Sequence, residues 1–408
     1  MNLWKPFCLI ALLALTACQS HIETDFTVQQ IESLIEQGNA LMTQNPAKAI
    51  ETFEHAKNLS LTTEEKAELA NIHQKLGYLY LIEGEFSQSN HNLRLALHFG
   101  LYDSDKNASA FYHLGRVNQK LKNYSNAVTY YKKALEHYVA KDLTDDVGLL
   151  SLYLGQSSAE LKAFEEALEF YSAAADIATA TNNSFLLGTS MNSKGNSLLE
   201  IEQYDEAISL FKSTLLKTST KTQKAITTHN LARAYYLNQE LEKAAALFEQ
   251  ALTLKQQVGN VPSQINSHYN YHEVLAAQGK AAAAQAQLEQ AVALARNGVP
   301  LTEAVALSHE ALQALYQAQG NYAGQVAVLQ QVSRLQDEAL EVVKDNLSQY
   351  DHLKVQYTDQ SIAHHKAMQL QKANARKNLL YLGAAIAVLV ALIAYLAYKR
   401  YRQKHMIS

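Results

Sequence analysis

The chain has 408 residues, of which 48% are hydrophobic, and its net charge of −4 includes no excess of basic residues. This balance argues against nucleic acid as a partner, because such binders carry a basic stripe. Only four prolines and fifteen glycines occur, and helix-forming residues dominate, which predicts an all-α fold. Both cysteines, Cys8 and Cys18, lie near the start, so the rest of the chain has no disulfide or thiolate metal site.

Residues 1–17 have the layout of an export signal peptide. Lys5 precedes an apolar run over 7–15, which is too short for a membrane span because a spanning helix needs about 20 residues. The run ends in "LTAC", which resembles a bacterial lipobox, and this resemblance implies lipidation of Cys18 and cleavage just before it. The alternative is an ordinary secretory signal that contains a cysteine. Residues 18–26 would then be a linker.

Three segments in the body of the chain repeat one pattern: "HLGRVNQKLKNYSNAVTYYKKAL", "YLGQSSAELKAFEEALEFYSAAA" and "SKGNSLLEIEQYDEAISLFKSTL". A Gly is followed nine residues later by an aromatic residue, then after three by Ala, after four by an aromatic residue and after three by a small residue. The positions are Gly115, Tyr124, Ala127, Tyr131 and Ala134, then Gly155, Phe164, Ala167, Tyr171 and Ala174, then Gly195, Tyr204, Ala207, Phe211 and Thr214. Related units on both sides bring the total to about eight over residues 27–335.

This pattern resembles the tetratricopeptide repeat, with a period near 40 residues instead of the usual 34. The resemblance implies helical hairpins that stack into a right-handed solenoid, because one hairpin cannot bury its own apolar face. We expect the Gly or Ala of each first helix to let the second helix approach closely, and the aromatic residues to fill the remaining space. His272 departs from the pattern, since it stands where other units have Gly or Ala.

The resemblance also implies a concave groove, lined by the first helices, that binds a peptide or protein partner. Amide, Tyr and Arg side chains at the groove positions suit the backbone and carboxylates of an extended peptide. The alternative for each position is a solvated face without a ligand. The candidate groove residues are Asn71, Gln74, Tyr78, Ser109, Tyr112, Arg116, Asn192, Asn196, His229, Arg233, Tyr236, Asn266, Tyr269 and Glu273.

Catalytic and metal sites are not predicted. His268 and His272 have the spacing of two metal ligands on one helix face, but no third ligand follows at a suitable distance, so packing is the favoured interpretation. The sequence has no glycine-rich phosphate loop and no nucleophile motif. We therefore predict a protein without a cofactor that is not an enzyme.

Residues 336–378 contain neither Gly nor Pro and predict a charged connector helix. Apolar residues at three- and four-residue spacing from Leu340 to Tyr350 allow a short coiled coil, and with it a homodimer. The coiled-coil pattern is interrupted at Lys354. A stiff connector is therefore the central expectation for this segment.

Residues 379–398 carry no charge and, at about 1.5 Å per residue, can cross a hydrocarbon core of about 30 Å. A buried helix is the alternative. The tail, 399–408, is basic, so the positive-inside rule predicts a cytoplasmic C-terminus. Together with the export signal, this places the repeats in the periplasm, on the inner membrane of a bacterial envelope.

Two functions fit this organisation. The first is a membrane-anchored periplasmic scaffold that binds protein or peptide partners in its groove. The second is a sensor subunit, because the layout resembles the periplasmic half of bacterial membrane regulators. In that case groove occupancy would pass through the transmembrane helix to a separately encoded cytoplasmic regulator.

Overall fold

The computed structural model describes residues 27–61, 66–100, 104–140, 144–295, 299–341 and 344. Its helices are α2 Pro46–Ser60, α3 Lys66–Ile82, α4 Phe86–Phe99, α5 Ser104–Lys120, α6 Tyr124–Ala140, α7 Thr144–Glu160, α8 Phe164–Ala180, α9 Ser184–Glu200, α10 Tyr204–Lys217, α11 Lys221–Leu237, α12 Leu241–Val258, α13 Val261–Ala277, α14 Ala281–Leu294 and α15 Glu303–Ala318. A helix over 27–41 precedes α2, and another over 322–341 follows α15. These described ranges contain no strand.

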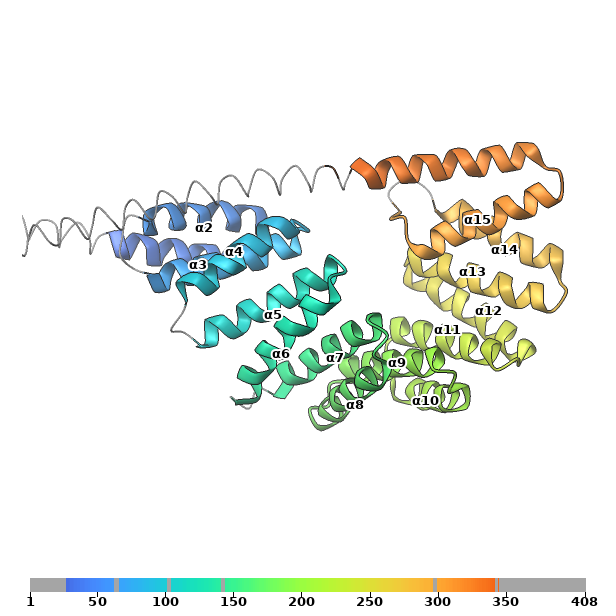
Figure 1. Ribbon diagram of the computed structural model, residues 1–408, viewed down its shortest axis with the longest axis horizontal. Coiled ribbons are helices and arrows are strands. Elements are labelled where there is room, and N and C mark those ends of the chain that lie inside the picture. Colours follow the sequence, from blue (N-terminus) through green and yellow to red (C-terminus); the bar gives the residue numbers. More distant parts are fainter. Residues whose placement is uncertain are drawn as a thin grey trace, which may run out of the picture. The chain divides into compact units, whose positions relative to one another are not determined.

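The helices are arranged as successive hairpins (Figure 1). Each first helix packs on the helix that follows it, from α3 with α4 to α13 with α14. The first helices of neighbouring hairpins also contact one another, as in α3 with α5, α9 with α11, α11 with α13 and α13 with α15. The all-α solenoid of helix pairs is therefore confirmed, and its first helices form a common layer.

From the α3–α4 hairpin onward, the turn inside each hairpin ends the first helix through a residue in the left-handed region. Lys162 has φ of 60°, its N–H donates to Ala159 O at 2.9 Å, and the N–H of Ala163 donates to Ser158 O at 2.9 Å. This pattern supplies donors to carbonyls that the helix end leaves unpaired. The same place is held by Gly84, Lys122, Glu202, Gln239, Gly279 and Gly320. From α3 onward the turn conformation is therefore constant, although the residue type at the left-handed position is not.

The close approach predicted at the repeat glycines is present. A Cβ atom on Gly115 would lie 2.4 Å from the ring of Tyr131, and one on Gly195 would lie 2.4 Å from the ring of Phe211. Both rings are fully buried. Gly38 stands in the same relation to Phe53, at 2.7 Å, so the first hairpin keeps a feature that the sequence pattern did not reveal.

We expect the Gly195→Ala substitution to lower the free energy of unfolding by about 1–3 kcal/mol, the usual effect of overpacking a core. Helix propensity alone would raise stability by roughly 0.5–1 kcal/mol, so the sign of the change shows which effect dominates. Urea unfolding followed by circular dichroism measures the change. A variant more stable than the wild type would contradict the close approach of α9 and α10.

Several predictions concern residues beyond the described ranges. The signal peptide, the Cys18 site, the span at 379–398 and the basic tail all lie outside them, as does most of the connector at 336–378. Among the helices that the structure describes, none combines the length and apolar character that a membrane span requires. The described residues belong to one compact unit, which ends at Asn346.

Candidate functional site

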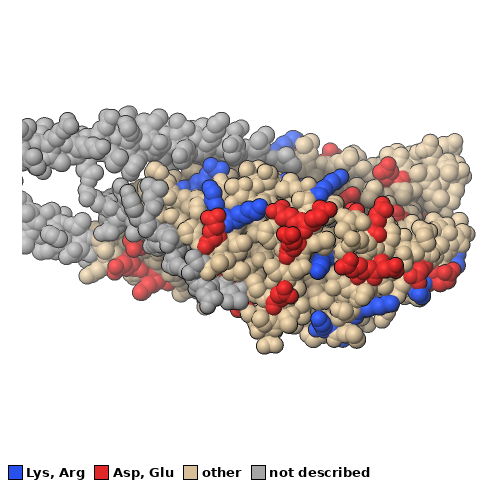
Figure 2. Space-filling view, turned by 60° about the horizontal axis from the view of Figure 1, so that its bottom comes forward, with Lys and Arg blue, Asp and Glu red and all other residues tan. Residues whose placement is uncertain are grey.

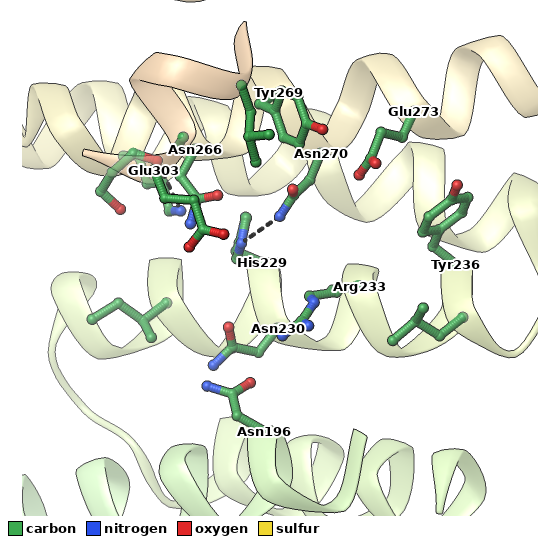
Figure 3. Close-up of a pocket in the computed structure, with 16 residues that line it drawn as sticks. Asn196, His229, Asn230, Arg233, Tyr236, Asn266, Tyr269, Asn270, Glu273 and Glu303 are labelled. Atoms are coloured by element: carbon green, nitrogen blue, oxygen red, sulfur yellow. Dashed lines mark hydrogen bonds between the residues drawn. The ribbon is translucent and has the colours of Figure 1, made fainter. Parts of the chain in front are cut away.

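A cavity of about 600 Å³ lies in the layer of first helices, between α9, α11, α13 and α15. Seven of the predicted groove residues line it: Asn196, His229, Arg233, Tyr236, Asn266, Tyr269 and Glu273. Figure 3 shows residues of α13 on one side of this cavity and residues of α11 on the other. The periodic groove positions therefore converge on one pocket in this part of the array.

The other predicted groove residues lie elsewhere. Six are on α3 and α5, at Asn71, Gln74, Tyr78, Ser109, Tyr112 and Arg116, and all six are half-buried. The guanidinium carbon of Arg116 lies 5.8 Å from the centre of the Tyr112 ring, which allows a cation–π contact. Their part in binding stays a prediction.

Asn192 occupies a contact between helices. Its side chain is buried and donates to Gly188 O and to Thr227 Oγ1, both at 2.8 Å, and it accepts from Asn230 Nδ2 at 3.0 Å. The bonds with Thr227 and Asn230 join α9 to α11. The amide of Asn192 is therefore used inside the protein, whereas neighbouring Asn196 lines the cavity and its Oδ1 has no hydrogen-bond partner within the described residues.

A row of buried polar groups runs along one side of the pocket. Lys255 on α12 donates from Nζ to Ser267 Oγ at 2.7 Å and to Ser263 O at 3.0 Å. Nδ1 of His229 lies 2.8 Å from the same Ser267 Oγ, and Nε2 lies 3.3 Å from Asn270 Nδ2 (Figure 3). Because the Asn270 amide nitrogen can only donate, Nε2 accepts, and the proton of a neutral His229 sits on Nδ1.

Burial lowers the pKa of both titratable groups in this row, Lys255 and His229. It lowers the pKa of Lys255 to about 7, since a charged ammonium loses its hydration there. It also lowers the pKa of His229 well below the usual range, and the charges of Lys255 and Arg233 act in the same direction. No carboxylate forms an ion pair with Lys255 among the residues that the structure describes. Lys255 is thus a buried base without a counterion.

The other charged groups of the pocket are in contact with water. Arg233 forms an ion pair with Glu200, with Nη2 and Oε1 2.9 Å apart. Burial raises the pKa of Glu273, and the charge of Arg233 opposes this shift. Glu303 is exposed at the first turn of α15. The pocket therefore has charges of both signs at its opening and one unpaired cation deeper inside.

Metal binding finds no support within the described ranges, where no three His, Cys, Asp or Glu side chains gather to hold an ion. His268 is buried and its Nδ1 lies 2.7 Å from Gln287 Oε1, while Nδ1 of His272 bonds to the carbonyl of Tyr269. The two imidazoles thus take part in packing and local hydrogen bonds.

The sequence reasoning missed Lys255, Asn230, Asn270 and Glu303, which also line the pocket. A signal for Lys255 exists in the repeat pattern. It lies four residues after the small residue of its second helix, where the three preceding units have Tyr138, Ala178 and Thr218. A lysine in a column of uncharged residues is the departure that could have drawn attention to it.

The fold and pocket define a helical-hairpin repeat protein with a polar groove. Two stretches, residues 108–136 and 223–297, match models of the tetratricopeptide repeat. The chain therefore carries tetratricopeptide repeats, as its residue pattern predicts, and the second matched stretch includes most of α11 and all of α13 of the pocket. No curated protein sequence matches the chain significantly.

Solved structures share the fold at low sequence identity. The apo form of the quorum sensor NprR from B. thuringiensis is 14% identical, with a TM-score of 0.54 over 78% of this chain and 99% of that one. The apo form of RapI is 14% identical, with a TM-score of 0.52 over 65% of this chain and 97% of that one. A Rap protein complexed with Competence and Sporulation Factor is 13% identical, with a TM-score of 0.50 over 80% and 93%. Solenoids of stacked repeats present extended concave surfaces that can bind partners.

Proposed function

We propose that this protein binds a peptide or protein partner in the groove formed by its first helices, with the pocket between α9 and α15 as the main contact. The main support is that amide side chains from three successive first helices line the same pocket. They belong to Asn196, Asn230, Asn266 and Asn270. Amides supply both donors and acceptors, which an extended peptide backbone needs at each residue.

The described residues on the face shown in Figure 2 form no large area of a single charge. On the face shown in Figure 2, basic and acidic side chains are interspersed, in keeping with the small net charge. Long-range attraction of a strongly charged partner would require a field of one sign over a large area. Specificity would therefore come from hydrogen bonds inside the groove.

The proposal includes a membrane anchor and a periplasmic position for the repeats. Its support is the sequence: an export signal over 1–17 that ends in a lipobox-like Cys18, an uncharged stretch over 379–398 and a basic tail. A spanning helix holds a protein in the membrane more firmly than a lipid chain does. The inner membrane is therefore the proposed location, with the tail in the cytoplasm.

A sensor subunit is the second candidate function. The fold similarity to NprR, a quorum sensor, favours it. In this version, a ligand in the groove shifts the connector at 336–378, and the transmembrane helix passes the change to a separate cytoplasmic regulator. A homodimer through the connector would suit such a relay.

One crosslinking pull-down from membranes tests both versions. The full chain is compared with Asn266→Trp, which places a large ring at an exposed position of the pocket, and with Gln250→Trp, a matched change of an exposed amide on α12. We expect Asn266→Trp to lose the captured envelope partner and Gln250→Trp to keep it. Equal capture by both variants would contradict binding in this pocket.

The same experiment includes a chain that ends after Arg400. If a cytoplasmic regulator is captured by the full chain and lost on this truncation, the sensor version is supported. If both chains capture the same envelope proteins and no regulator, the scaffold version holds and the tail serves only as an anchor.

A further inference from the structure

We propose that the pocket holds a carboxylate group of its ligand on Lys255, an assignment that rests on the proposed groove function. Lys255 belongs to α12, a second helix, and its side chain reaches the cavity between the first helices. The residue is 3% exposed. A lysine is rarely buried in this way without a charged partner.

The ammonium has donor capacity to spare. Of its three hydrogens, one is accepted by Ser267 Oγ and another by Ser263 O. Ser267 is occupied as well, since His229 bonds to the same oxygen. A third acceptor is missing among the residues that the structure describes, so a ligand oxygen at the cavity wall would complete the set.

The charges around Lys255 favour one anionic group. Helix α11 contributes Arg233, already paired with Glu200, and His229, which is neutral. Helix α13 contributes His268, also held neutral by burial, and Glu273. A single carboxylate would compensate the one unpaired cation, whereas a doubly charged phosphate would meet repulsion from Glu273 and from Glu303 of α15.

The carboxylate has two sources in a peptide ligand, the C-terminus and the side chain of Asp or Glu. Both present a planar pair of oxygens that accept charge-assisted hydrogen bonds, here from Lys255 and from the amide groups of Asn266 or Asn270. The pocket selects for a carboxylate, and peptides with free or amidated C-termini distinguish the C-terminus from an Asp or Glu side chain.

Proton uptake is a direct consequence of this arrangement. A carboxylate next to Lys255 favours the charged ammonium and therefore raises its pKa. Because burial leaves the amine largely neutral above neutral pH in the free protein, binding at pH 8 should take up about one proton. Affinity should accordingly fall as the pH rises from 7 to 9.

The test uses the full chain in detergent micelles and three pools of short random peptides. The first pool has free C-termini and contains Asp and Glu, the second has the same sequences with amidated C-termini, and the third is amidated and lacks Asp and Glu. Peptides retained by the protein are identified by mass spectrometry. The variant is Lys255→Met, and the control is Lys243→Met, at an exposed position on the same helix.

We expect the wild-type chain and Lys243→Met to retain the carboxylate-free pool at least about tenfold less well than the best carboxylate pool. Loss on amidation would identify the C-terminus as the source, and retention after amidation would identify Asp or Glu. The Lys255→Met variant, with an unchanged circular dichroism spectrum, should lose the preference. Calorimetry of the best peptide in buffers of different ionisation enthalpy should show the proton uptake.

Other results would contradict the assignment of a carboxylate to Lys255. If the wild-type chain retains the carboxylate-free pool as well as the others, or if Lys255→Met keeps the preference, the assignment to Lys255 is overturned while binding in the groove stands. If the wild-type chain retains no pool, peptide binding in the groove fails together with this assignment.

Discussion

Acidification from pH 7 to pH 4 is expected to lower the free energy of unfolding by roughly 6 kcal/mol through two buried histidines alone. Burial lowers the pKa of His73 to about 4 and that of His113 to about 3. His229 acts in the same direction. A loss of this size approaches the whole stability of an ordinary domain, so the repeat array should unfold in mild acid.

The direction of this pH effect follows from how many protons the folded and unfolded states bind. In the folded protein these imidazoles stay neutral, whereas in the unfolded chain they take up a proton below about pH 6.5. The unfolded state therefore binds more protons, and stability is present above pH 6.5 and falls as the pH decreases. For His113, the charges of Arg116 and Lys75 add to burial, while for His73 the hydrogen bond to Asn92 opposes it.

His113→Phe isolates one of these contributions. The ring lies 5.2 Å from Tyr78 and 5.0 Å from Tyr112, and Nδ1 has no hydrogen-bond partner within the described residues. A phenyl ring therefore keeps the packing and removes the titration. We expect the loss between pH 7 and pH 4 to shrink by roughly 3 kcal/mol, as measured by urea unfolding at each pH.

The control for this prediction is His55→Gln, because His55 is exposed on α2. This variant should follow the wild-type pH profile. Parallel profiles for His113→Phe and the wild type would show that His113 is protonated in the folded protein and would contradict its burial.

The fold could be predicted from the sequence because packing constraints recur with the repeat. In several hairpins a residue without a large side chain lies opposite a buried ring, so Gly115 with Tyr131 and Gly195 with Phe211 appear at the same spacing. Five constraints repeated along the chain define the helix pairs and their order. Gly38 escaped detection because it lies 15 residues before Phe53, whereas the glycines of the other units lie 16 residues before their buried rings.

The pocket could be predicted only in part, since its key residues break the repeat. Positions on the first helices follow the period and led to His229 and Arg233. Lys255 lies on a second helix, in a column where other hairpins place uncharged residues. Asn192 fits the period of the groove, yet its amide pairs with α11, because neighbouring repeats bring Asn230 within 3.0 Å. Spacing identifies the helix face, and the contacts of each side chain decide its role.

The substitution Lys255→Met is expected to raise the free energy of unfolding at pH 7 by about 3 kcal/mol. Burial lowers the pKa of Lys255 to about 7 from its ordinary value of about 10.4, which corresponds to a penalty on the order of 5 kcal/mol against the charged amine. Loss of the hydrogen bonds to Ser263 and Ser267 subtracts about 2 kcal/mol from the gain. Methionine fills a similar volume and needs no partner.

The gain should depend on pH in a defined way. Between pH 7 and about 10.4 the unfolded chain carries a charged lysine and the folded protein a neutral one, so the unfolded state binds more protons and wild-type stability rises with pH. The stability advantage of the variant is therefore largest at neutral pH. It disappears by about pH 9, where the remaining penalty for burying the lysine, roughly 2 kcal/mol, equals the free energy of the hydrogen bonds that the variant loses. Lys224→Met, at an exposed position on α11, should show no such dependence.

Urea unfolding of the three proteins at pH 7, 8 and 9 measures this difference. A variant that is less stable than the wild type at every pH would mean that Lys255 is satisfied in the folded protein without a ligand. The expected result is a more stable variant that has lost its preference for carboxylate ligands. Residues that oppose folding are concentrated at functional sites, because there the interaction that compensates them comes from the ligand.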